Sequence, residues 1–156
     1  LEAKHLWLVQ SLPIPPWQVL QAKLSVQLLL TGIPALFCCV CVQFLCPVSP
    51  VERVLLVLVP MLYVLFSALF GLFLGIKLPN LTWTNELAPI KQSASVMIAL
   101  LGGWAYGVAL AGLYLAFAWR LGLALYLALF ALVTAVGCVV LYRWLKTRGA
   151  ELFANL

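Results

Sequence analysis

Charged residues are scarce in this sequence. Its 156 residues include nine Lys or Arg, four Asp or Glu and one His, so charged side chains make up 8% of the chain and apolar ones 66%. A soluble domain averages roughly 25% charged and about 45–50% apolar residues. The polar surface that would cover a water-exposed globule is therefore lacking. This excludes an ordinary soluble enzyme, a disordered segment and a nucleic-acid-binding module.

The groups that catalysis and cofactor binding require are also few. His5 is the only histidine, and the four acids, Glu2, Glu52, Glu86 and Glu151, are widely spaced. The chain has no G-x-x-x-x-G-K-[ST] loop with which to bind ATP itself. We therefore expect no catalytic residues, no metal site and no cofactor. The chain is predicted not to be an enzyme.

The five cysteines do not form an even disulfide framework. They are Cys38, Cys39, Cys41, Cys46 and Cys138. No His or acid lies close to the first four, and an apolar setting disfavours thiolates. We interpret them as small apolar residues; a metal or redox role for Cys38 and Cys41, which can share a helix face, is the alternative.

Long apolar blocks without charge are what the sequence has in abundance. Residues 24–46, 54–76, 96–119 and 121–142 form four such blocks of 22 to 24 residues. At a rise of 1.5 Å per residue, each exceeds the roughly 30 Å hydrocarbon core of a bilayer. The apolar residues cover every face, which is typical of a membrane-spanning helix. We predict an all-α polytopic membrane protein with four transmembrane helices, preceded by a cytoplasmic amphipathic segment.

The cations outside these blocks are unevenly distributed. Residues 1–23, 77–95 and 143–156 together hold seven Lys or Arg, whereas the two short connections hold only Arg53 and Arg120. Cytoplasmic loops carry the excess of positive charge in membrane proteins. Both termini and the middle loop, residues 77–95, are therefore predicted to be cytoplasmic, in an integral protein of the plasma (cytoplasmic) membrane.

Small residues recur every fourth position in two blocks, so that each set lies on one stripe of a helix. The two sets are Ser67, Gly71 and Gly75 in the second block, and Gly103, Gly107 and Ala111 in the third. Such stripes let helix backbones approach closely, and we predict that they are packing faces. The pattern leaves open whether they pack within this chain or against another subunit.

The blocks contain no Asp, Glu, Lys, Arg or His in their interior. Buried ionisable residues usually mark proton relays and ion paths. Their absence argues against a proton-coupled transporter or a charged pore formed by this chain alone.

The middle loop has more hydrogen-bonding side chains than a simple linker between two spans requires. Thr84 or Asn85 can cap a short helix that ends before Pro89, and Ser93 or Ser95 can cap the third span. A capped loop at the membrane surface is one interpretation, and a partner-binding loop is the other. The candidate residues for such contacts are Trp83, Asn85, Glu86, Lys91 and Gln92.

Two stretches resemble permease subunits of ATP-binding-cassette exporters of the type-2 class. Residues 2–23 begin with an acid, continue as a short apolar helix with a Leu-x-x-x-Leu-Pro bend, and end in a lysine that enters the next span. The middle loop, through Trp83-Thr84-Asn85-Glu86 and Lys91-Gln92-Ser93, and the tail Trp144-Leu145-Lys146-Thr147-Arg148-Gly149 are similar to a bacterial branch of these exporters. Ala3 and the Pro15-Pro16 pair depart from the family, which often has Gly and a Ser-containing turn there.

The resemblance implies the C-terminal part of a longer permease. Residues 1–23 would be the coupling segment, and the four blocks the third to sixth spans. The implied partners are a separate ATPase subunit, a missing N-terminal permease half or second permease subunit, and the lipid membrane, but no nucleic acid. ATP hydrolysis on the ATPase would drive substrate export. A non-transport membrane scaffold or assembly protein with four helices is the alternative. The candidate ATPase contacts are Glu2, Lys4, Trp7, Pro13 and Lys23.

Overall fold

All regular secondary structure among the described residues is helical. The computed structural model describes residues 15–45, 47, 49–78, 94–117, 122–149 and 151–152. The elements are α2 (Pro16–Leu45), α3 (Pro50–Lys77), α5 (Ala94–Phe117), α6 (Leu123–Trp144) and the short π-helix η2 (Leu145–Gly149). Four helices are long and apolar enough to cross a membrane. The prediction of an all-α membrane protein with four spans is confirmed.

The helices do not coincide with the charge-free blocks of the sequence. α2 begins at Pro16, whereas the first block begins at residue 24. The extra turns are helical because Leu20, which is 2% exposed, packs against the core while polar neighbours face outward. α6 begins at Leu123, one residue after its N-cap, Gly122. Hydropathy marks the part of a helix that suits lipid, whereas the hydrogen-bonded helix can begin or end several residues to either side of those limits.

Both ends of α3 are closed by side-chain hydrogen bonds. Pro50 begins the helix, where the missing amide costs nothing, and Ser49 is its N-cap. The Ser49 amide donates to Oε2 of Glu52 at 2.9 Å, as in a capping box. At the other end, the Ser95 hydroxyl of α5 donates to the Leu78 carbonyl at 2.7 Å. Ser95, which the sequence suggests as a cap for its own helix, instead ties the start of α5 to the end of α3.

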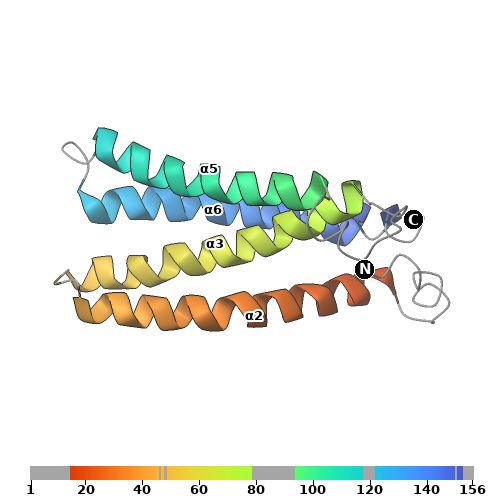
Figure 1. Ribbon diagram of the computed structural model, residues 1–156, viewed down its shortest axis with the longest axis horizontal. Helices are drawn as coiled ribbons and strands as arrows, with labels where there is room; N and C mark the ends of the chain where they lie inside the picture. The colour runs from red at the N-terminus through yellow and green to blue at the C-terminus, as the bar shows by residue number, and fades with distance from the viewer. Residues whose placement is uncertain are drawn as a thin grey trace.

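α3 is the central helix of the bundle. It runs diagonally between α2 and the pair formed by α5 and α6 (Figure 1), and it packs against all three. α2 begins, α3 ends, α5 begins and α6 ends at one end of the bundle, the right-hand end in Figure 1. The connections on either side of α3 therefore lie at opposite ends of the bundle.

The core consists of two clusters along α3. One joins α2, α3, α6 and η2 through Leu20, Leu24, Ala68, Leu69, Ile76, Cys138 and Leu145. The other joins α3 and α6 through Val59, Tyr126, Leu127 and Ala131. None of the described side chains of α5 is buried. α5 is therefore the peripheral helix of the bundle, and specific side-chain contacts hold it there.

Candidate functional site

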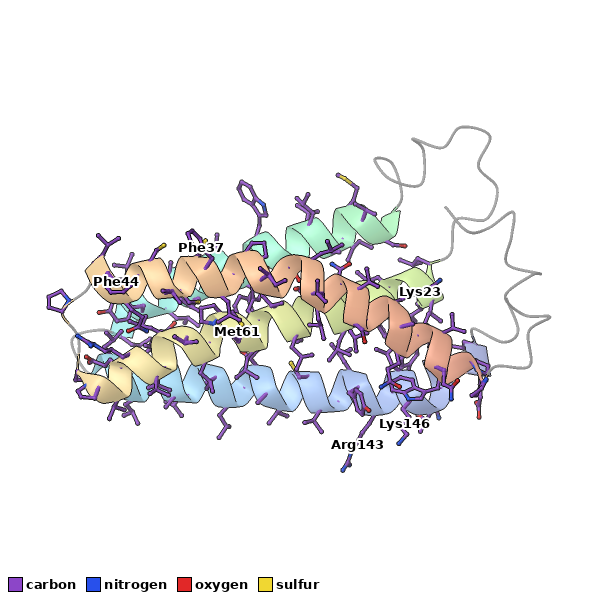
Figure 2. All side chains as sticks on the ribbon, turned by 90° about the horizontal axis from the view of Figure 1, so that it is seen from below. Lys23, Phe37, Phe44, Met61, Arg143 and Lys146 are labelled. Atoms are coloured by element: carbon purple, nitrogen blue, oxygen red, sulfur yellow. The ribbon has the colours of Figure 1, made fainter. Side chains whose placement is uncertain are left out.

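Most described cations lie at one end of the bundle. Figure 2 shows Lys23, Arg143 and Lys146 at this end. The complete set here is Lys23, Lys77, Arg143, Lys146 and Arg148, which we call the basic end. Arg53 in the first turn of α3 is the only cation among the described residues at the opposite end. The charge asymmetry expected from the sequence thus has a counterpart in the folded bundle.

Aromatic rings tie the helices together at the basic end. Trp17 of α2 meets Tyr142 of α6 edge to face, with ring centroids 5.3 Å apart. Phe73 of α3 packs against Trp144 at 4.7 Å. The Lys77 ammonium lies 5.4 Å from the centroid of the Phe73 ring, within the range of a cation–π contact. A displacement of the start of α2 would therefore be transmitted directly to α6, and to α3 through the apolar core.

The two polar stretches singled out in the sequence join the bundle at this basic end. Residues 1–14 precede α2, and residues 79–93 connect α3 to α5. Lys23 is the one candidate ATPase contact that the structure describes, and it is half-buried on α2. The other candidates lie outside the described residues: Glu2, Lys4, Trp7, Pro13, Trp83, Asn85, Glu86, Lys91 and Gln92.

A cluster of hydroxyl-bearing side chains lies among α3, α5 and α6. The Thr134 hydroxyl donates to the Phe130 carbonyl at 2.8 Å. Its single proton is thereby used, so the Tyr106 hydroxyl, 3.0 Å away, donates to Thr134 Oγ1. Tyr126 donates to the Leu110 carbonyl at 2.6 Å. Tyr63 stacks on Tyr106 with centroids 4.4 Å apart. These contacts hold α5 against its neighbours.

The hydroxyls of Tyr106, Tyr126 and Thr134 all have hydrogen-bond partners. Among the described residues, no buried side-chain oxygen or nitrogen is without a hydrogen bond. Sequence reasoning did not single out Tyr106, Tyr126 and Thr134. The signal was available, because a hydroxyl in lipid must find a partner within the protein. The hydrogen bonds of Tyr106, Tyr126 and Thr134 thus form a helix-association contact.

The glycines that receive close contacts are mostly outside the predicted stripes. A Cβ at Gly102 would lie 3.2 Å from Cε1 of Phe70, and one at Gly137 would lie 3.1 Å from Cε2 of Phe66. Both partners are rings of α3. At these two glycines, phenylalanine rings of α3 therefore pack close to the backbones of α5 and α6.

The predicted stripes themselves make few contacts within this chain. A Cβ at Gly103 would lie 2.7 Å from the Tyr63 hydroxyl, whereas nothing lies within 4 Å of one at Gly71, Gly75 or Gly107. Ser67 is half-buried and donates to the carbonyl of Val64 at 2.9 Å. Ala111 is exposed. Of the two stripes, only Gly103 therefore receives a close side-chain contact among the glycines in the described part of the chain.

The described cysteines are free thiols. Cys39 is buried, whereas Cys38 and Cys41 are exposed on α2. The Cys138 thiol lies 3.7 Å from the Leu62 carbonyl of α3, as a weak donor. Within the described part of the chain, no group of three His, Cys, Asp or Glu side chains is placed to hold a metal ion.

Two grooves open on the outside of the bundle, both toward the end opposite the basic end. The first, of about 520 Å³ between α2 and α3, is lined by Gln43, Arg53, Val54, Val57, Leu58 and Met61. The second, of about 340 Å³ between α5 and α6, is lined by Leu113, Phe117, Tyr126, Leu129, Phe130 and Val133. Among the described lining residues of the two grooves, Arg53 of the first groove is the only charged one.

The chain matches no family model, no curated protein and no solved structure. Its membership of the all-α, four-span membrane proteins rests on its own helices, and its activity has to be inferred from its residues and their arrangement.

Proposed function

We propose that the chain is the transmembrane permease portion of an ATP-driven exporter, in which ATP hydrolysis on a separate ATPase subunit is coupled to substrate export. One observation carries the proposal: residues 1–14 and 79–93 join the bundle at the same end. A single partner at that end can contact both stretches. The resemblance of the same stretches to exporter permeases supports the proposal from the sequence.

The packing of α2 provides a route from that partner into the membrane. The start of α2 buries Leu20 and Leu24 against Leu69 and Ile76 of α3. α3 in turn packs against α5 and α6. Movement of residues 1–14 would therefore displace the central helix and, through it, the whole bundle. This is the property that a coupling segment requires.

A membrane scaffold without transport activity is the second candidate. One observation favours it: within the described spans, every buried side-chain oxygen or nitrogen has a hydrogen-bond partner, and no Asp, Glu, Lys, Arg or His is buried. A polar solute would find no path through this chain alone. A scaffold and an exporter of apolar substrates are both compatible with such an interior.

The test is co-purification of the chain with an ATPase encoded beside it, in wild type and in a charge-swapped variant, Glu2→Lys/Lys4→Glu. If these residues face a surface of complementary charge, the exchange brings like charges together, which strongly disfavours association. We therefore expect at least about a tenfold loss of retained ATPase. The matched control is Lys146→Glu/Glu151→Lys, which exchanges the same charges in the tail. Control and wild type should retain the ATPase equally.

Two results would contradict the proposal at different levels. Equal retention and equal ATPase stimulation in the swapped variant would reject the proposed contact at residues 1–14. A stable complex whose ATPase activity in vesicles does not respond to any candidate substrate would instead support the scaffold.

A further inference from the structure

The groove between α2 and α3 combines an apolar wall with one cation at its end. Val54, Val57, Leu58 and Met61 follow Arg53 at spacings that keep them on one side of α3. Met61 lies beside α2 in Figure 2. From Arg53 to Met61 the helix rises about 12 Å, close to the depth of one leaflet in a hydrocarbon core of roughly 30 Å.

The Arg53 guanidinium is available for a ligand. It makes no hydrogen bond or ion pair within residues 15–45, 49–78, 94–117 and 122–149. The backbone carbonyl of Arg53 accepts a hydrogen bond from Nε2 of Gln43 at 2.8 Å, which joins α2 to α3 at this end of the groove. The neighbouring Glu52 carboxylate accepts the Ser49 amide at the N-cap.

The position of Arg53 matches the depth of lipid phosphates. It lies in the first turn of α3, at the boundary between the apolar helix and the polar connection. A guanidinium binds phosphate oxygens through two parallel hydrogen bonds. The apolar residues below it would face the acyl chains of the same leaflet.

We propose that this groove binds one anionic phospholipid, with its phosphate on Arg53 and an acyl chain along Val54, Val57, Leu58 and Met61. A second copy of this chain fits less well, because a symmetric contact would bring two Arg53 guanidinium groups together. Among the described residues, those that line the groove between α5 and α6 include no charged side chain. The proposal depends only on α2 and α3, so it applies to an exporter and to a scaffold alike.

The test is native mass spectrometry of the full chain in detergent, titrated with phosphatidylglycerol or with phosphatidylcholine of the same acyl chains. A cation near the membrane surface favours an anionic lipid by about fivefold, and we expect Arg53→Gln to abolish this preference. The control Arg143→Gln removes a cation at the basic end and should keep the preference.

A second pair of variants tests the apolar wall. Leu58→Trp fills the groove and should weaken the binding of both lipids by about fivefold or more. Val136→Trp places the same ring on an exposed position of α6 and should bind as wild type does. Circular dichroism verifies that each variant is folded. If Leu58→Trp does not fold, the comparison of Arg53→Gln with Arg143→Gln decides whether the groove binds an anionic lipid.

Four outcomes would overturn the proposal. Arg53→Gln could retain the preference for phosphatidylglycerol, or Arg143→Gln could lose it to the same extent, which would indicate diffuse charge attraction. A folded Leu58→Trp could bind both lipids as wild type does. Dimers that form without lipid and disappear in Leu58→Trp would identify a second copy as the occupant.

Discussion

At the scale of single residues, the described part of the protein buries polar side-chain atoms only where each has a hydrogen-bond partner. Tyr106, Tyr126 and Thr134 lie in apolar helices, and their hydroxyls bond to one another or to backbone carbonyls. In water such bonds compete with solvent, whereas in lipid the only alternative is an unsatisfied group. Measured interhelical hydrogen bonds in membranes average about 0.6 kcal/mol because the unfolded state finds partners too.

We predict that Tyr126→Phe destabilises the bundle by about 1 kcal/mol, because it removes the 2.6 Å hydrogen bond to Leu110 and keeps the ring. Unfolding of the full chain by added sodium dodecyl sulfate, followed by circular dichroism, measures the change. Tyr142→Phe is the matched control, since that side chain is 42% exposed at the end of α6. Equal effects of the two substitutions would show that the Tyr126 hydrogen bond contributes nothing particular.

At the scale of elements, α3 determines how the other helices pack. Its aromatic side chains Phe66 and Phe70 reach the glycines of α6 and α5, where a side chain would collide with them. Large side chains on α3 thus pack against glycines, which have no side chain, on the neighbouring helices. The recurrence of small residues every fourth position, which motivated the predicted stripes, is a different pattern and identified neither Gly102 nor Gly137.

We predict that Gly137→Leu destabilises the folded bundle by about 1–3 kcal/mol, since even a Cβ would lie 3.1 Å from the Phe66 ring. Gly112→Leu is the control because nothing lies within 4 Å of a Cβ there. Both variants gain the same helix propensity, so their difference reports packing alone. The measurement is again unfolding in mixed micelles; no difference between the variants would contradict the packing of Phe66 against α6.

The bounds of the elements illustrate what hydropathy can and cannot predict. The four spans were found from their length and lack of charge, because such segments are stable in lipid only as helices. Hydropathy does not locate the start of α2 at Pro16, since residues 16–23 are mixed in polarity. The prolines before this point do predict that a helix restarts near Trp17 as a lead-in to the first span. The helical state of residues 16–23 depends on packing of Leu20 against α3, which a local pattern does not contain.

At the scale of the whole molecule, the bundle is asymmetric in charge. The basic end holds five of the described cations, and Arg53 lies at the other end. Electrostatic bias of this kind orients helices during insertion, with the positive end retained in the cytoplasm. The orientation remains a prediction from the charge pattern. The folded bundle shows which residues lie at each of the two ends that the orientation concerns.

We predict that Pro47→Cys reacts with a membrane-impermeant maleimide in intact cells, whereas Arg148→Cys reacts only after permeabilisation. Both positions are exposed, at opposite ends of the bundle. The five native cysteines are replaced by alanine in both variants so that the background is silent. The reverse labelling pattern would overturn the predicted orientation and would place residues 1–14 and 79–93 away from any cytoplasmic ATPase.

The sequence by itself determined the class of the protein and the number of its spans. Lipid offers no hydrogen bonds to a backbone, so twenty or more apolar residues suffice to specify a helix. Which faces meet was decided only by the tertiary structure. A helix that is apolar on every side has no polar or apolar face that predicts which helix it packs against. The rotation and axial position of each helix instead decide its contacts. Examples are the pairing of Tyr106 with Thr134, the contact of Gly137 with Phe66 and the groove at Arg53.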